Sequence, residues 1–454
     1  MFQSRFHSLN NLFNRYRRLA ALILVPIGLL VSAFAIYDDI QSYTSENSSA
    51  YSVSRQMLSE ALGGQITQNV FPEKIALPLS KGDDPAEYRV NYTLASDLQN
   101  HAEALLRRYK PDYGAIVMMD ARTGEILAMT SFEKNNSEND DNLALKSGYP
   151  AASVFKVITA AAAVDKAGIT PEHRIAFNGG NYTLYKKNVL SDNVNRWTRF
   201  ITLKEAFAMS INTAFGRLTL ESLEPEDLSE YARKFFFNKE IPSDFPVETS
   251  SIFVPDEKGY ALAQVASGYN RFNTLSPVHG AMIASAIVNE GQIPAPYLVK
   301  SIENDQHEVI YSAQPQISGQ AISAKSANKV KQMMEQTVLT GTSRKTFRRI
   351  VRERQFKEVE MGGKTGHFTG TNPRGRTDWF VGYASDEDSR IAIAAITVNV
   401  KYWTVKSSAL SEMMFRRYFK NKLEEAKMLS DTDEHDGEAE RPARKTARAR
   451  KHRS

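Results

Sequence analysis

A serine and a lysine three residues apart, Ser153 and Lys156, are a pair of side chains that could do chemistry together. They stand at the head of an alanine-rich apolar run, residues 157–164. This run predicts a buried helix that begins just after Pro150 and ends at Gly168. On one helix face the hydroxyl and the amine can meet, and a serine in the first turn lies among backbone N–H groups without intrahelical partners. That arrangement suits a nucleophile.

The Ser-x-x-Lys spacing is not specific by itself, because it occurs twice more, starting at Ser131 and at Ser326. Ser131 lies in a polar stretch, and Ser326 is predicted to lie on the solvated face of an amphipathic helix. Taken alone, the motif favours the interpretation of Ser153 as a small residue near a helix N-terminus. Its interpretation therefore depends on the rest of the chain.

Two further motifs follow Ser153 in order. Ser210 and Asn212 come directly after an apolar helix predicted over residues 203–209, which a Thr-x-x-Glu capping box opens. A Lys-Thr-Gly follows two glycines at residues 364–366, in a strand-rich part of the chain. A second Ser-x-Asn, starting at Ser191, lies in a polar stretch with no helix leading into it. We interpret Ser191 as a loop residue and prefer Ser210.

The ordered trio resembles the motif set of the penicillin-binding proteins and serine β-lactamases. The likeness extends over residues 88–420 and includes the stretches 114–130, 203–215, 281–302 and 379–383. It implies a fold of the α/β (α+β) class, with a mainly antiparallel sheet covered by helices and an all-helical subdomain.

The same resemblance implies a serine-type D,D-transpeptidase. Ser153 would attack the carbonyl of the penultimate D-Ala of a peptidoglycan stem peptide and release the terminal D-Ala. The acyl group would then pass to an amine of a neighbouring stem, and β-lactams such as penicillin would acylate the same serine. We expect no metal and no other cofactor, because the histidines lack metal-ligand spacing and no phosphate-binding loop occurs.

The catalytic roles also follow from the chemistry of the residues. A serine hydroxyl needs a base to take its proton, and a lysine can be that base only when it is neutral. Burial, or a nearby cation such as Lys364, can lower the pKa of a lysine by about 3–5. We therefore expect Lys156 to be buried or close to Lys364. Ser210 can relay the proton towards the leaving amine.

The remaining motif residues are predicted to bind the substrate. Asn212 can hold both Lys156 and a substrate amide. Lys364 and Thr365 can bind a substrate carboxylate. Gly366 lets a peptide approach the strand edge and add to it as a further strand.

The oxyanion hole is expected from the backbone N–H groups of Ser153 and His367. His367 departs from the family pattern, which usually has a small hydroxyl residue directly after the glycine. The backbone donor survives this change, so acylation is still expected. The side chain is either a specificity determinant or an edge-strand residue that faces solvent.

Other functions stay open at this point. A D,D-carboxypeptidase would use water as the acceptor. A β-lactamase would need a base that speeds deacylation, for which Glu172 is a candidate. A protein of another class, a non-catalytic sensor of β-lactams or muropeptides or a scaffold for wall synthesis, would fit the departure at His367 but not the intact trio.

The 454 residues allow two or three domains, but the sequence indicates one catalytic domain with attachments. Residues 1–18 are basic, and residues 19–37 are uncharged and long enough to cross a membrane once. Residues 38–87 are predicted to be a polar stalk with a short helix near residues 56–62. The transpeptidase-like domain is expected over residues 88–425. A disordered charged tail is expected over residues 426–454.

The uncharged run begins at Leu19 and ends at Tyr37, and its basic flank precedes it. The positive-inside rule then places the N-terminus in the cytoplasm of a bacterium and the domain in the periplasm or another extracytoplasmic space. Cleavage near Ala35 is the alternative. The absence of cysteine fits an exported protein.

Two expectations concern partners. No glycosyltransferase region precedes the predicted domain, so a separate glycan polymerase is the expected partner. The net charge of +5 is modest and owes much to the basic tail, so nucleic acid binding is not expected.

Apolar runs and turns predict a β-hairpin near the start of the domain and three strands near its end. With helices at both ends of the chain, these strands would form one covered sheet. The predicted strands are 114–120, 125–129, 358–363, 378–384 and 390–399, and the predicted helices are 94–109, 226–237, 276–289, 324–339 and 407–425.

Overall fold

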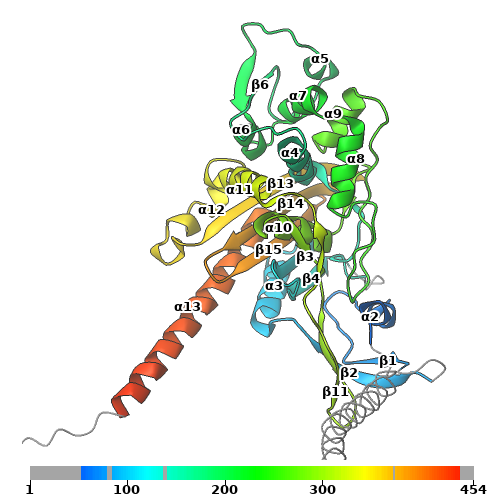
Figure 1. Ribbon diagram of the computed structural model, residues 1–454, viewed down its shortest axis with the longest axis vertical. Helices are drawn as coiled ribbons and strands as arrows, with labels where there is room; N and C mark the ends of the chain where they lie inside the picture. Colours follow the sequence, from blue (N-terminus) through cyan, green and yellow to red (C-terminus); the bar gives the residue numbers. More distant parts are fainter. Residues whose placement is uncertain (1–52, 79–83, 136–140, 372–373, 440–454) are drawn as a thin grey trace, which may run out of the picture. The chain divides into compact units, whose positions relative to one another are not determined.

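The computed structural model describes residues 53–78, 84–135, 141–371 and 374–439. The chain divides into two compact units, Met1–Val53 with Ala76–Glu87, and Ser54–Ile75 with Tyr88–Ser454. Almost all of the first unit lies outside the described residues, so the architecture below is that of the second (Figure 1). The predicted membrane anchor over residues 19–37 also lies outside them. None of the helices that the structure describes is long and apolar enough to cross a membrane.

A five-stranded antiparallel sheet lies at the centre of the second unit, with the strand order β13-β14-β15-β3-β4. Its members are β3 (Tyr113–Asp120), β4 (Ile126–Glu133), β13 (Glu360–Thr371), β14 (Arg374–Ser385) and β15 (Arg390–Asn399). The predicted antiparallel sheet and its opening hairpin are confirmed. The edge strand β13 contains the Lys-Thr-Gly motif, so one side of this motif has no neighbouring strand in the sheet.

Helices cover both faces of this sheet, which explains why its strands are apolar almost throughout. On one face α3 (Ser96–Tyr109) and α13 (Ser407–Ala439) bury residues such as Leu105 and Phe415 against Phe380 and Ile393. On the other face lies α10 (Pro277–Val288), which Figure 1 shows across the strands. Its Gly280 lets the helix approach the sheet closely, since a Cβ there would lie 3.0 Å from the Ala394 side chain.

The middle of the chain is mostly helical. Its elements are the 3-10 turn η1 (Ala152–Phe155), α4 (Lys156–Asp165), α5 (Lys186–Val189), α6 (Leu203–Ala208), α7 (Asn212–Ser222), α8 (Pro225–Lys234), α9 (Tyr260–Ala266) and α11 (Ala324–Leu339). The all-helical subdomain is nevertheless a wrong prediction, because β6 (Arg174–Phe177) pairs with β7 (Arg199–Thr202) in this region. The alternate burial of Ile175 and Phe177 makes this short pair possible, and four residues are too few for a clear sequence signal.

The remaining elements are short. β5 (Tyr149–Pro150) pairs with β8 (Thr274–Leu275), and β9 (Gln292–Pro294) pairs with β12 (Ile317–Gln320). Between α11 and β13 lie α12 (Arg344–Phe347) and the 3-10 turns η2 (Ile350–Arg352) and η3 (Arg354–Phe356).

The stalk predicted over residues 38–87 is wrong where the structure describes it. The short helix expected near residues 56–62 is present as α2 (Arg55–Leu62), but it buries Leu58 and Leu62 instead of lying in a solvated stalk. β1 (Lys74–Leu77) and β2 (Ala86–Tyr92) join β10 (Val299–Glu303) and β11 (Val309–Ser312) in a sheet of order β1-β2-β10-β11. Composition could not show this, because the partner of Val90 in β2 is Ile302, more than 200 residues later.

The disordered tail predicted over residues 426–454 also needs correction. Helix α13 continues beyond residue 425 to Ala439, and residues 440–454 lie outside the described residues. The charged composition suggested disorder, and only half of residues 426–439 are strong helix formers, so propensity alone does not explain the helix. Extending an existing helix avoids the cost of nucleating a new one.

Candidate active site

One cleft of about 1070 Å³ brings the three motifs together. Its lining includes Ser153 from η1, Ser210 from the turn before α7, Asn212 from the first position of α7, and Thr365 and His367 from β13. Elements separated by more than 200 residues in the chain therefore meet at the edge of the central sheet.

Lys156 lies beneath the cleft and is fully buried. It opens α4, one turn after Ser153, and its Nζ lies 2.9 Å from Ser153 Oγ and 2.7 Å from Asn212 Oδ1. The same nitrogen donates to the backbone carbonyl of Ser267. A neutral amine that donates to Asn212 and Ser267 retains a lone pair, which can accept the hydroxyl proton of Ser153.

The surroundings of Lys156 favour its neutral form. Burial, and to a lesser degree the nearby charge of Lys364, lowers the pKa of Lys156 well below its ordinary value of 10.5. Both causes were expected from the sequence. Burial therefore favours the uncharged amine, and its contact with the Ser153 hydroxyl places it to act as the base.

Ser210 occupies a turn between α6 and α7, where its φ of 55° is in the left-handed region. Such a backbone is costly for a residue other than glycine and persists when the surroundings hold it. Here the capping box of Thr202 and Glu205 fixes the start of α6, as predicted, and Phe207 O accepts the Ser210 N–H. The result is a serine that points towards the second lysine of the site.

That second lysine is Lys364, which is also fully buried. Its Nζ donates to Ser210 Oγ at 2.9 Å and to the carbonyl of Thr365 at 2.8 Å. Burial lowers the pKa of Lys364 to about 7. A carboxylate bound nearby would favour the charged form of this lysine.

Gly366 brings β13 close to η1. A Cβ at this position would lie 3.2 Å from the Val154 side chain and 3.4 Å from the carbonyl of Ala151. The neighbouring Thr365 shares a short hydrogen bond with Thr342, with 2.6 Å between their hydroxyl oxygens. The strand is thus fixed beside the turn that holds Ser153.

The His367 side chain is neither free nor fully solvated. Its Nε2 lies 2.6 Å from Asp378 Oδ1, directly across β13 and β14, and its ring packs 5.6 Å from that of Trp403. Asp378 is only 3% exposed, and its other carboxylate oxygen accepts the backbone N–H of Ser407. The description of His367 as an edge residue facing solvent is therefore incomplete.

Sequence reasoning missed the residues after α9. One of them is Ser267, whose carbonyl accepts from Lys156. The other is Gly268, whose φ of 66° and lack of a side chain let its backbone pack against Ala152, the residue before Ser153. A Cβ on Gly268 would lie only 1.9 Å from the carbonyl oxygen of Ala152. The available signal was a Ser-Gly directly after the apolar run 260–266, which is typical of a helix end.

The other candidate serines lie elsewhere. Ser191 is in a loop, where its carbonyl accepts from Arg217 and its hydroxyl accepts from Asn193 N. Ser131 on β4 donates to the carbonyl of Gln68. Ser326 is buried in the first turn of α11 rather than solvated as predicted, and its backbone N–H donates to the capping Ser323 hydroxyl. None of the three lines the cleft.

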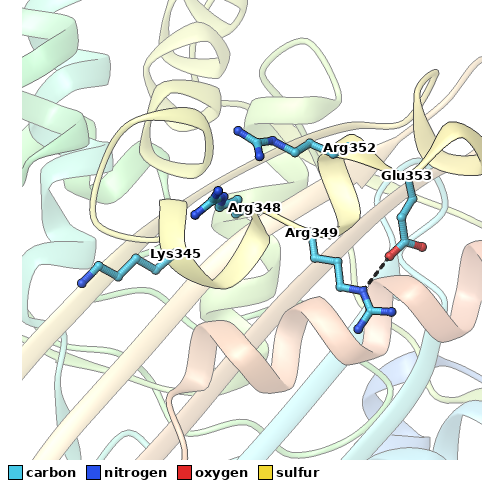
Figure 2. Close-up of a pocket in the computed structure, with 5 residues that line it drawn as sticks. All are labelled: Lys345, Arg348, Arg349, Arg352 and Glu353. Carbon is cyan, nitrogen blue, oxygen red and sulfur yellow. Dashed lines mark ion pairs between the residues drawn. The ribbon is translucent and has the colours of Figure 1, made fainter.

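A second hollow, of about 570 Å³, is lined by four cations and one acid (Figure 2). Lys345, Arg348, Arg349 and Arg352 project from α12, η2 and the turn between them, and Arg349 pairs with Glu353 at 3.3 Å. Phe347 and Ile350 point inward and are buried, which leaves the basic residues on the surface. This hollow contains no nucleophile. No group of three or more His, Cys, Asp or Glu that could hold a metal ion occurs among the described residues.

Comparison with known proteins agrees with this geometry. The family model of the penicillin binding protein transpeptidase domain matches residues 114–420. The peptidoglycan D,D-transpeptidase PbpA of Mycolicibacterium smegmatis is 26% identical over 355 residues, which are 69% of this chain and 68% of that protein.

Two solved structures show the same fold. The D,D-transpeptidase domain of a peptidoglycan glycosyltransferase from Eggerthella lenta has 26% identity and a TM-score of 0.60, and the match covers 74% of this chain and 84% of that one. Penicillin-binding protein A from M. tuberculosis, solved as a penicillin G acyl-enzyme complex, has 25% identity and a TM-score of 0.59, with 75% and 82% covered. On the match of the family model over most of its length, this chain belongs to the family of penicillin-binding protein transpeptidase domains.

Proposed function

We propose that this protein is a serine D,D-transpeptidase that cross-links peptidoglycan stem peptides and is acylated by penicillin. The observation that supports this most directly is the contact of 2.9 Å between the buried Lys156 and Ser153. A hydroxyl in contact with an uncharged amine is the arrangement that an acyl-transfer nucleophile needs. The named activity of the mycobacterial relative and the acyl-enzyme of the solved one agree with it.

In the acylation step Ser153 Oγ attacks the carbonyl carbon of the penultimate D-Ala, and Lys156 takes its proton. The tetrahedral intermediate is stabilised by the backbone N–H groups of Ser153 and His367, where the loss of one such donor typically costs about 10²–10³ in rate. Ser210 passes a proton to the leaving amine of the terminal D-Ala, and Lys364 is the adjacent proton source. The C–N bond breaks and D-Ala departs.

Substrate binding uses the free edge of β13. Lys364 and Thr365 bind the terminal carboxylate, and Asn212 holds a substrate amide together with Lys156. In the second step an amine of a neighbouring stem attacks the ester carbonyl. The proton of this amine passes through Ser210 to Lys364. The ester C–O bond breaks, Lys156 returns its proton to Ser153 Oγ, and the free serine is regenerated.

The β-lactamase alternative finds little support at Glu172. This side chain is 64% exposed, pairs with Lys204 at 3.3 Å and does not line the cleft, so it is not placed to activate water at Ser153. A D,D-carboxypeptidase shares the whole acylation machinery and differs only in its acceptor. The effect of an added acceptor amine on the products therefore separates a carboxypeptidase from a transpeptidase.

We also infer the setting of the enzyme from the sequence. The uncharged run over residues 19–37 acts as a single membrane anchor with the N-terminus inside, and the catalytic domain works outside the bacterial cytoplasmic membrane. Its partner is a separate glycan polymerase, which supplies the glycan strands that carry the stems. Alkali-resistant membrane association of the full chain, lost on deletion of residues 1–37, would support the anchor.

The acceptor test uses release of D-Ala from a stem pentapeptide by the purified protein and by Ser153→Ala. We expect release by the wild type only, and we expect added acceptor amine to divert product into a cross-linked peptide. Release that is unchanged by any acceptor amine, with hydrolysed tetrapeptide as the sole product, would instead identify a carboxypeptidase.

A further inference from the structure

The lining of the cleft is cationic. Of the described residues that line it, Arg271, Arg376 and Lys406 are basic and none is acidic. None of these three takes part in an ion pair within the described part of the chain, and all three are exposed. The nearest buried acid, Asp378, is already bonded to His367 and to Ser407 N. The cleft therefore has basic groups available for an anionic ligand.

The strand pattern places Arg376 relative to the motif. Side chains two residues apart on a strand share a face, and Thr365, His367 and Thr369 of β13 all line the cleft. Arg376 is the direct partner of Thr369 across β13 and β14. The cleft thus runs from the Lys-Thr-Gly motif along one face of β13 to the guanidinium of Arg376. Thr369, a small residue, lies between Arg376 and the free edge of the sheet.

This geometry fixes which substrate residue meets Arg376, if the proposed function holds. With the terminal carboxylate at Thr365 and the scissile carbonyl at the His367 N–H, an extended stem peptide advances along the edge in step with β13, by about 3.4 Å per residue. The residue before the two D-Ala residues, the third of the stem, then lies beside Thr369.

We propose that Arg376, assisted by Lys406, binds a free carboxylate on the side chain of the third stem residue. Lys406 lines the same part of the cleft, since its neighbour Ser407 is bonded to Asp378 next to His367. The preferred substrate class is then a stem whose third residue is a diamino diacid. A stem with lysine there brings a positive charge towards two cations, and a stem with the amidated diacid lacks the anion.

The test compares three stem pentapeptides that differ only at the third residue: a diamino diacid, its side-chain amide, and lysine. We expect kcat/KM for D-Ala release to be about five- to tenfold higher for the free acid than for the other two, the size of a partly exposed charge-assisted contact. Arg376→Gln should remove this preference by lowering kcat/KM for the free acid, and it should not lower kcat/KM for the lysine peptide, which loses a repulsive charge. The matched control is Arg374→Gln, because Arg374 is exposed on the same strand but does not line the cleft.

The rate of acylation by penicillin separates this inference from the proposed function, because penicillin lacks the third stem residue. We expect Arg376→Gln to be acylated at the wild-type rate. Equal use of the three peptides by the wild type, or an equal loss in Arg374→Gln, would overturn the inference while acylation still supports the enzyme. Slower penicillin acylation in Arg376→Gln would overturn it too, by assigning Arg376 to the terminal carboxylate. No acylation of the wild type would refute the proposed function, and this inference with it.

Discussion

Gly268→Ala should disable the nucleophile although the Ser153 side chain itself is unchanged. Gly268 has a φ of 66°, where an alanine costs about 1–2 kcal/mol. Its new Cβ would lie 1.9 Å from the Ala152 carbonyl oxygen, far below the 3.0 Å that real Cβ atoms keep, so η1 must move by about 1 Å. Because a misplacement of about 1 Å can cost about 10² in rate, we expect acylation of Ser153 by penicillin to slow about a hundredfold.

The chain provides a matched control for this change. Gly168 has nearly the same φ, 68°, but a Cβ there would meet nothing within 4 Å. Gly168→Ala should therefore lose a similar 1–2 kcal/mol of unfolding free energy and keep the wild-type acylation rate. Stopped-flow labelling with a fluorescent penicillin and urea denaturation measure the two effects. Acylation of Gly268→Ala within threefold of wild type would refute the proposed support of Ser153 by Gly268.

Three further predictions test other parts of the site. Lys156→Gln should slow penicillin acylation by about 10²–10⁴, the usual contribution of a general base. Lys329→Gln, in the Ser-x-x-Lys that starts at Ser326, should leave the rate unchanged. Equal rates for the two variants in the labelling assay would be inconsistent with Lys156 as the base. Lowering the pKa of Lys364 from 10.5 to about 7 corresponds to a penalty of about 5 kcal/mol, present in full below pH 7 and lost as the pH rises towards 10.5. The difference in unfolding free energy between Lys364→Met and wild type should therefore favour the variant most near pH 6 and least near pH 10. A difference in denaturant midpoints that does not change with pH would contradict this. Asp378→Ala leaves the buried Ser407 N–H without its acceptor and should lower the unfolding free energy by about 1–3 kcal/mol, more than Asp378→Asn, which keeps an oxygen there; equal losses would argue against that bond.

The parts of the molecule that could be predicted are those with local signals. The helix 324–339 and the strand 390–399 have the predicted bounds, because their apolar patterns are long and end at polar turns. The capping box before Ser210 is present as expected. The site residues could be proposed because three short motifs in order are specific where each one alone is not.

The parts that could not be predicted depend on contacts between distant segments. The strand over residues 86–92 is short and polar on one face, and its partner in β10 comes much later in the chain, so composition suggested a stalk. The bond between His367 and Asp378 depends on the register of β13 with β14. The role of Gly268 depends on its close contact with the Ala152 carbonyl. Ala152 is more than 100 residues away in the chain, so the sequence does not predict this contact.

The central claim is that Ser153 is a nucleophile, and mass spectrometry of the intact protein and of its proteolytic peptides after incubation with penicillin tests it most directly. We expect the wild type to gain the mass of one penicillin on the peptide that contains Ser153, to keep it for minutes or longer, and Ser153→Ala to gain nothing. An unmodified wild type, rapid loss of the adduct with turnover of penicillin, or equal modification of Ser153→Ala would contradict the account.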